Sequence, residues 1–299
     1  MNASSYEPPH NRELNVALIQ MTSSGDLGQN LDFLIKHITL AAQEGADYIQ
    51  TPENSLFMEL DPKKVAHITQ SQEYTQALKE LFQCAATHKV WLHIGSIASP
   101  LAEKQVNEKG NALLANRSYL IGPDYSAAQD QQDLYFYDKI HMFDVTLPNG
   151  EHYQESANYA PGEKAFVVEC DFNDFSAKLG LTICYDLRFP ALYRHLALEG
   201  AEMISVPAAF TQTTGEAHWH VLLRARAIET GCFIIASGQT GLHENGRSTF
   251  GHSLIISPWG EVLLDAGSEP GLYHKRIDLS EVQRVRQIVP SLNHGKLFQ

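Results

Sequence analysis

The sequence predicts a layered α/β fold, in which helices cover the outer faces of two packed sheets to give an αββα arrangement. Short apolar runs of strand length alternate with amphipathic stretches along almost the whole chain of 299 residues, and no internal repeat or low-complexity tract interrupts them. Hydrophobic residues make up 43% of the chain, enough for a large buried core. We expect residues 1–13 to form a flexible tail and residues 14–299 a single domain.

Each predicted element of the first half rests on its local pattern. Apolar runs at 14–20 and 46–50 predict buried strands, and apolar residues at helical spacing between them predict a helix over 28–45. Pro52 has no N–H to donate and ends the second strand, which leaves Glu53 just past it. The pattern then predicts a helix over 74–88 and strands over 90–97, 110–121 and 134–140, with an Asn116-Arg117 pair that would allow a hairpin turn.

The second half continues the alternation. Residues 144–161 are rich in Pro, Gly and Asn and are expected to form a loop. An apolar strand over 177–183 leads directly to Cys184. The tetrapeptide Ser257-Pro258-Trp259-Gly260 predicts the turn of a hairpin over 251–264. The remaining predicted elements are helices at 190–198 and 217–230, strands at 201–206 and 231–237, and a final strand and helix within 271–289.

Three chemically reactive side chains lie at the ends of predicted strands: Glu53, Lys139 and Cys184. Ligands of α/β proteins bind at such strand ends, so we expect a site there. A tight turn between the strand before Cys184 and the helix after it would expose the thiol and place backbone N–H groups beside it, which suits a nucleophile. Taken singly, the three have simpler interpretations: a small buried hydrophobe for the cysteine and solvated charges for the other two.

Charge and cysteine content exclude several classes of protein. The formal net charge of −13 repels phosphate backbones, so no nucleic acid partner is expected. The four cysteines include no CxxC pair, which argues against zinc-ribbon and thioredoxin-like sites and favours reduced thiols in the cytoplasm. The N-terminal residues lack a signal-peptide pattern, and no apolar run reaches the roughly 20 residues that span a bilayer, so no membrane association is expected.

Fourteen histidines raise the question of a metal site. His218 and His220 are the tightest cluster, but side chains two residues apart on a helix point in different directions. The chain has no HExxH motif and no Asp/His cluster with ligand spacing, so no metal is expected.

Three motifs together resemble those of the nitrilase-like carbon–nitrogen hydrolases. They are Thr51-Pro52-Glu53-Asn54, Tyr137-Asp138-Lys139-Ile140-His141-Met142-Phe143-Asp144 and Ile183-Cys184-Tyr185-Asp186-Leu187-Arg188-Phe189-Pro190. They occur in the order and spacing of that family, and the resemblance extends from Leu14 to about Pro290. The resemblance implies a four-layer αββα sandwich of the carbon–nitrogen hydrolase type and a Glu–Lys–Cys triad.

By this resemblance, Cys184 is the nucleophile, Glu53 is the general base, and Lys139 stabilises both the thiolate and the oxyanion. The backbone N–H of Tyr185 is the second oxyanion donor, which places this residue at the substrate. Glu155 matches the second glutamate of amidase branches, which orients the lysine. The implied reaction is hydrolysis of a carbon–nitrogen bond through a thioester, with release of ammonia and a carboxylic acid. It requires no cofactor.

Several further residues have a structural interpretation beside a functional one. Arg188 is equally well a structural ion-pair partner or a bidentate clamp for a substrate carboxylate, the role that the fourth residue after the nucleophile has in related carbamoyl-hydrolysing enzymes. Asp138 and Asp186 are interpreted as structural, and Trp219 and Trp259 as core residues. The other cysteines, Cys84, Cys170 and Cys232, are expected to be buried and inert.

The later segments bear on the substrate. Residues 207–215, 217–229, 251–253 and 258–261 resemble the amidase branch that contains deaminated-glutathione amidase and omega-amidase. This implies a small amide substrate that carries a carboxylate, and a homodimer or higher homo-oligomer. Residues 126–133 and 242–248 depart from that branch, and either segment could reshape the mouth of the pocket. The alternatives are a nitrilase, an N-carbamoyl amide hydrolase and, in a different class, a non-catalytic scaffold, which would be free to lose the triad.

Overall fold

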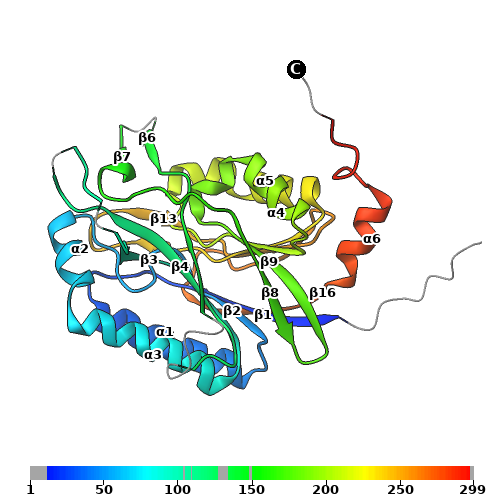
Figure 1. Ribbon diagram of the computed structural model, residues 1–299, viewed down its shortest axis with the longest axis horizontal. Helices are drawn as coiled ribbons and strands as arrows, with labels where there is room; N and C mark the ends of the chain where they lie inside the picture. Colours follow the sequence, from blue (N-terminus) through cyan, green and yellow to red (C-terminus); the bar gives the residue numbers. More distant parts are fainter. Residues whose placement is uncertain (1–11, 104, 109, 127–133, 148–149, 297–299) are drawn as a thin grey trace, which may run out of the picture.

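The computed structural model describes residues 12–103, 105–108, 110–126, 134–147 and 150–296. Residues 1–11 of the expected tail and residues 127–133 of the connector lie outside the described residues. Two six-stranded sheets pack face to face, and helices cover the outer face of each (Figure 1). These are the four αββα layers that the sequence predicts.

The first sheet has the strand order β16-β1-β2-β3-β4-β5. Its strands are β1 (Glu13–Gln20), β2 (Tyr48–Gln50), β3 (Trp91–Pro100), β4 (Leu114–Ile121), β5 (Leu134–Asp138) and β16 (Gly271–Asp278). Helices α1 (Leu27–Gln43) and α3 (Gln72–His88) cover its outer face, and α2 (Pro62–Thr69) precedes α3. The side chains of Asp26 and Ser71 accept hydrogen bonds from backbone N–H groups of α1 and α3, which fixes where these helices begin.

The second sheet has the strand order β15-β14-β11-β10-β9-β8. Its strands are β8 (Phe166–Phe172), β9 (Phe175–Leu181), β10 (Met203–Ser205), β11 (Phe233–Ala236), β14 (Leu254–Ile256) and β15 (Val262–Asp265). Helices α4 (Pro190–Leu198) and α5 (Gln212–Thr230) cover its outer face, and α6 (Ser280–Ile288) follows β16. The shorter elements are the pair β6 (Asp144–Thr146) and β7 (His152–Gln154), the pair β12 (Thr240–Leu242) and β13 (Ser248–Phe250), and the 3₁₀ turns η1 (Glu155–Ala157) and η2 (Cys184–Arg188).

The centre of each sheet is parallel. In the first sheet β1, β2 and β3 run in the same direction, and in the second sheet β9, β10 and β11 do so. Parallel strands are covered on both faces, which explains why the sequence is almost continuously apolar there. The segments that carry Glu53 and Cys184 follow the carboxyl ends of β2 and β9.

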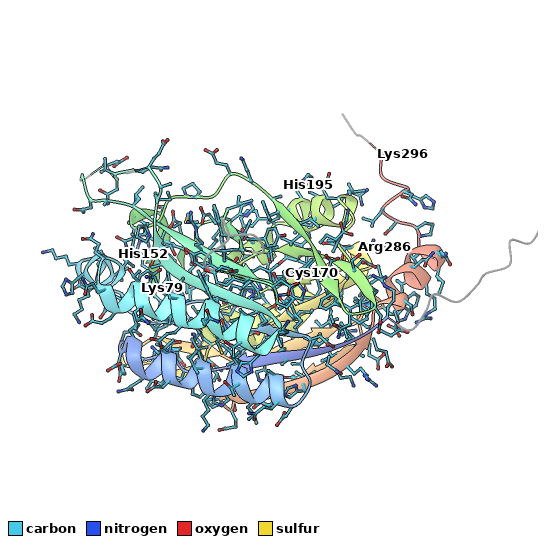
Figure 2. All side chains as sticks on the ribbon, turned by 60° about the horizontal axis from the view of Figure 1, so that its bottom comes forward. Lys79, His152, Cys170, His195, Arg286 and Lys296 are labelled. Carbon is cyan, nitrogen blue, oxygen red and sulfur yellow. The ribbon has the colours of Figure 1, made fainter. Side chains whose placement is uncertain are left out.

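Apolar side chains fill the space between the sheets and beneath the helices (Figure 2). Cys84, Cys170 and Cys232 are buried free thiols, as the sequence predicts. Trp219 is 1% exposed and lies in the core, but Trp259 is 59% exposed, so the core interpretation is wrong for Trp259. Its place in the hairpin turn between β14 and β15 leaves its indole outside the packed layers.

Two local predictions are wrong for a physical reason. Asn116 and Arg117 do not form a hairpin turn, because β4 runs straight through them and pairs with β3 on one side and β5 on the other. Ladder hydrogen bonds on both edges outweigh the turn preference of a single asparagine. The loop expected at 144–161 contains β6, β7 and η1, and β8 was not anticipated. None of the described helices is both long and apolar enough to cross a bilayer.

Candidate active site

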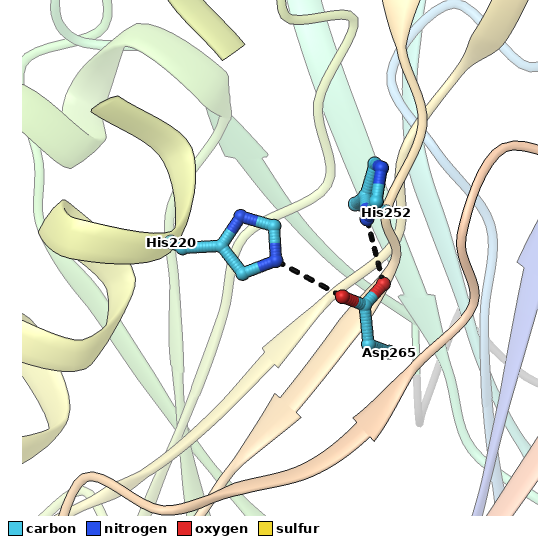
Figure 3. Close-up of side chains that lie close together, drawn as sticks. All are labelled: His220, His252 and Asp265. Carbon is cyan, nitrogen blue, oxygen red and sulfur yellow. Dashed lines mark hydrogen bonds and ion pairs between the residues drawn. The ribbon is translucent and has the colours of Figure 1, made fainter. Parts of the chain in front are cut away.

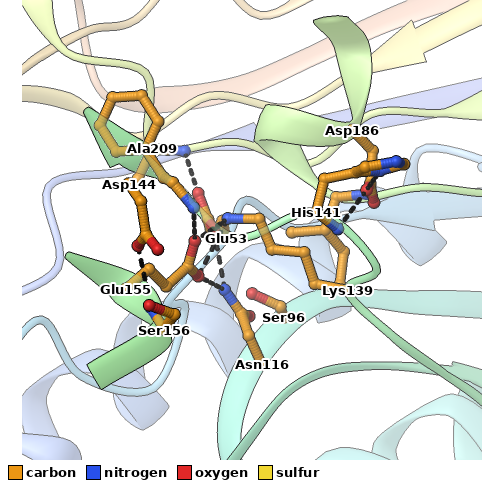
Figure 4. A network of polar contacts seen from close by, with 12 residues as sticks. Glu53, Ser96, Asn116, Lys139, His141, Asp144, Glu155, Ser156, Asp186 and Ala209 are labelled. Atoms are coloured by element: carbon orange, nitrogen blue, oxygen red, sulfur yellow. Dashed lines mark hydrogen bonds and ion pairs between the residues drawn. The ribbon is translucent and has the colours of Figure 1, made fainter. Parts of the chain in front are cut away.

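Glu53, Lys139 and Cys184 meet at a cavity of about 620 Å³. They follow β2, β5 and β9 respectively, so the structure brings together three strand ends that are distant in sequence. Glu155, in η1, and Tyr185, in η2, line the same cavity. Figure 4 shows the Lys139 side chain reaching the carboxylates of Glu53 and Glu155.

The Lys139 ammonium is held between two carboxylates. Its Nζ lies 3.0 Å from Oε1 of Glu53 and 2.9 Å from Oε2 of Glu155. Asn116 on β4 donates from Nδ2 to Oε1 of each glutamate, at 2.9 Å in both cases. The backbone N–H of Ala209 donates to the other oxygen of Glu53 at 2.8 Å. Buried charges need this degree of pairing and hydrogen bonding, because their desolvation is costly.

Cys184 begins the turn η2 in a conformation that is unusual for a residue with a side chain. Its φ is 47°, in the left-handed region, and its N–H donates to the carbonyl of Pro207 at 2.9 Å. The Asp186 carboxylate anchors the turn by accepting from the Ile183 N–H at 2.9 Å and from the Tyr137 hydroxyl at 2.7 Å. Such outliers persist where the surroundings fix them, which is common at functional sites.

Electrostatics set the protonation of the three groups. Burial raises the pKa of Glu53, but the Lys139 ammonium and a hydrogen bond from the Cys184 thiol together hold it below its usual value. Burial lowers the pKa of Lys139, but Glu155 and Glu53 hold it well above its usual value. Burial and then the Glu53 carboxylate raise the pKa of Cys184, and Lys139 only partly opposes them. Lys139 thus favours the thiolate form of Cys184, as expected, but burial and the Glu53 carboxylate have the larger effect on the pKa of the thiol.

Asp186 and Asp138 are structural, as the sequence predicts. Asp186 is fully buried and also accepts from the backbone N–H of His141 at 3.0 Å, so it ties the turn at Cys184 to the segment that carries Lys139. Asp138 accepts two hydrogen bonds from Arg117 across the β4–β5 pair, at 2.6 and 2.9 Å.

Arg188 lies outside the cavity lining. One of its Nη atoms is 3.2 Å from Nδ1 of His218, and its guanidinium lies 5.8 Å from the ring centre of Tyr185 and 5.5 Å from that of Phe210. Among the described residues it has no carboxylate partner, so the structure supplies neither the ion pair nor the direct access to the cavity that the two sequence interpretations require.

Among the cavity residues that the sequence did not indicate are Asn116 and Arg247. Asn116 was interpreted as a possible turn residue, and nothing in the local pattern singles it out, because Arg117 and Ser118 follow it in β4. Arg247 lies in the segment 242–248 that departs from the amidase branch. That segment does contribute to the pocket, as the sequence suggested it could.

Three side chains outside the cavity have a composition that transition metals bind: His220, His252 and Asp265. Their ligand atoms lie within 4.8 Å of one another. Nε2 of His220 is 3.0 Å from one carboxylate oxygen of Asp265, and Nδ1 of His252 is 2.8 Å from the other (Figure 3). The three groups thus satisfy one another and tie α5 to β15. The sequence argument missed this cluster because it compared only histidines that are neighbours in the chain.

The family of the chain follows from comparison with known proteins. Residues 15–287 match the model of the carbon–nitrogen hydrolase family. The chain belongs to this family. It is an enzyme that hydrolyses carbon–nitrogen bonds other than peptide bonds, as the three motifs implied.

Relatives within the family include several amidases. A deaminated glutathione amidase of Synechocystis is 42% identical over 282 residues, which cover 93% of this chain and 96% of the relative. The human deaminated glutathione amidase is 34% identical over 290 residues, covering 94% and 82% respectively. A probable hydrolase, nit2, of Schizosaccharomyces pombe is 35% identical over 285 residues, covering 94% and 98%.

Solved structures of this family confirm the fold. The NitFhit protein of C. elegans superimposes with a TM-score of 0.82 at 30% identity, over 96% of this chain and 66% of that protein. Nit3 of Saccharomyces cerevisiae, a member of the nitrilase superfamily, superimposes with a TM-score of 0.76 at 25% identity, over 93% of this chain and 95% of that protein.

Proposed function

We propose that this hydrolase cleaves the amide bond of a small substrate that carries a carboxylate, with Cys184 as nucleophile, Glu53 as general base and Lys139 as the cation of the oxyanion site. The observation that carries the proposal is the hydrogen-bonded contact of the Cys184 thiol with the buried Glu53 carboxylate, beside the Lys139 ammonium, in one cavity. A base of this kind can take the thiol proton as the sulfur attacks, so a standing thiolate is not needed.

The reaction has two halves. The Cys184 proton passes to Glu53 as the sulfur bonds to the amide carbon, and the Lys139 ammonium and the Tyr185 backbone N–H stabilise the oxyanion. Glu53 then protonates the nitrogen, the carbon–nitrogen bond breaks, and an amine leaves behind a thioester. Water gives a proton to Glu53 and adds to the thioester. The carbon–sulfur bond breaks, the sulfur regains its proton, and the carboxylic acid is released. Glu155 positions Lys139 throughout.

The substrate class is supported by the relatives named deaminated glutathione amidase. The leaving amine depends on the substrate. A primary amide such as 2-oxoglutaramate gives ammonia. The amide of deaminated glutathione is substituted by the rest of the tripeptide and gives cysteinylglycine. Both give 2-oxoglutarate, so production of this acid is a better first readout than release of ammonia.

The proposed function is tested with a substrate panel. We expect the wild-type enzyme to form 2-oxoglutarate from deaminated glutathione or 2-oxoglutaramate. The 2-oxoglutarate is measured by its reductive amination in a coupled assay with glutamate dehydrogenase. An N-carbamoyl amino acid and an aliphatic nitrile serve as comparison substrates, with ammonia as the readout. Turnover of the nitrile or the carbamoyl compound alone would replace the amide assignment with one of the alternatives. A folded protein that leaves all four compounds intact would favour a non-catalytic role.

We also propose that two copies pair through the outer face of α5. Val221 and Ile228 lie two turns apart on this helix and are 67% and 53% exposed, and Trp259 beside them is 59% exposed. The carbonyl of Gly260 accepts from Arg224 of α5 at 2.8 Å, which places the tryptophan turn against the helix. Exposed apolar side chains gathered in this way mark an interaction surface. Sedimentation should give a dimer for the wild type and a monomer for Val221→Asp combined with Ile228→Asp; a wild-type monomer at micromolar concentration would contradict the proposal.

We place the enzyme in the cytoplasm, because its four cysteines are free thiols and buried, as expected for a chain kept under reducing conditions.

A further inference from the structure

The active-site cavity contains a guanidinium without a carboxylate partner. Arg247, in the turn between β12 and β13, lines the cavity together with Cys184. None of the ion pairs in the described part of the chain involves Arg247. Its Nε is buried and has no hydrogen-bond partner, whereas one Nη donates to the carbonyl of Ala209. Several described arginines form no ion pair, but Arg247 is the one among them that lines the cavity.

The surroundings hold this side chain in place. The backbone of Arg247 closes its own turn, because its carbonyl accepts from the His243 N–H at 2.8 Å and its N–H donates to the Asn245 side chain at 3.0 Å. The guanidinium lies 5.4 Å from the ring centre of Tyr153, which also lines the cavity. An aromatic ring on one side and a carbonyl on another restrict the orientation of the guanidinium at the cavity wall.

Arg247 and Glu53 both contact the backbone of Ala209. Its Nη bonds the carbonyl of Ala209, and the N–H of the same residue holds Glu53. The guanidinium therefore lies beside the general base, on the segment that borders the cavity. The lysines that line the cavity differ from it: Lys139 is paired with two carboxylates, and Lys63 is exposed to solvent.

We propose that Arg247 binds the carboxylate of the substrate and thereby selects amides of dicarboxylic acids, with the 2-oxo acid amides as the chemical class that fits. This inference rests on the proposed function and adds the residue that recognises the substrate. A guanidinium offers N–H donors in a planar fork that matches a carboxylate, and among the described arginines only Arg247 lines the cavity. Arg188, the candidate from the sequence, lies outside the cavity lining and contacts His218 instead.

The test compares two arginines on two substrates. Arg247→Met and Arg188→Met are assayed with 2-oxoglutaramate and with a neutral aliphatic amide of similar length. We expect Arg247→Met to lower kcat/KM for the carboxylate substrate by roughly 10- to 100-fold, mainly by raising KM. The kcat/KM for the neutral amide should change far less. Arg247→Lys should recover part of the loss, since it restores the charge without the fork. Arg188→Met should change kcat/KM for the two substrates by the same factor.

A binding measurement separates this inference from the proposed function. In the Cys184→Ala background, calorimetry with 2-oxoglutaramate should detect binding that Arg247→Met weakens by a similar factor, whether or not the wild type turns this compound over. An equal loss on both substrates would assign Arg247 to support of Glu53 and overturn the inference. A selective loss in Arg188→Met, or unchanged binding in Arg247→Met, would overturn it as well. Absence of turnover by the wild type on every amide would instead count against the proposed function.

Discussion

Cys184→Ala is expected to abolish amide hydrolysis, lowering kcat by at least about 10⁴-fold while leaving the fold intact. The sulfur is the atom proposed to form the acyl-enzyme, and neither the buried carboxylates nor the lysine can replace it as nucleophile. Alanine removes little volume at a position that is 7% exposed and borders the cavity, so the cost in stability should be small. Single-turnover kinetics and thermal unfolding of the purified variant measure both quantities.

Cys84→Ala is the matched control for this variant. Cys84 is a buried free thiol on α3, away from the cavity, and its replacement should leave kcat unchanged. With the wild type, acid quenching during turnover followed by mass spectrometry should find the acyl group on the peptide that contains Cys184. The proposed nucleophile would be ruled out if Cys184→Ala kept more than about 1/10² of the activity of Cys84→Ala. An acyl group found on another residue would rule it out as well.

Lys139→Met is expected to abolish activity and also to lower the free energy of unfolding by about 3–5 kcal/mol. The substitution removes the only cation within 3.0 Å of the Glu53 and Glu155 oxygens among the described residues, while methionine retains most of the volume of the side chain. Two carboxylates would then be buried close together without a counter-charge, and the pKa of Glu53 would rise. Urea unfolding at neutral pH measures the loss of stability, and the substrate assay measures the loss of turnover.

A double variant separates the electrostatic cause from a packing defect. Lys139→Met combined with Glu155→Gln removes one of the two unpaired charges and should regain part of the lost stability, but not the activity, because the oxyanion cation is still missing. The same recovery should appear in Lys139→Met alone as the pH is lowered enough to protonate the carboxylates. A double variant less stable than Lys139→Met would show that packing, and not charge, accounts for the loss.

The order of residues predicts the layered fold and the candidate residues of the site. The apolar runs that precede Glu53 and Cys184 are strands because a parallel sheet covered on both faces requires continuous hydrophobic residues, and this requirement is visible locally. The polar residue that ends such a run marks the edge where ligands bind, so Glu53, Lys139 and Cys184 could be named as candidates from their positions, and the family resemblance supplied their expected roles.

The tertiary structure decided which side chains share the cavity and how they are charged. Asn116 and Arg247 reach the cavity only because β4 runs straight and the β12–β13 turn folds over Ala209, and neither contact leaves a local pattern in the chain. The pKa of Cys184 also depends on distances through space: Lys139 lowers it, but burial and the Glu53 carboxylate raise it by more. Strand formation depends on neighbours along the chain, whereas desolvation and charge coupling depend on packing between segments that the sequence does not place side by side.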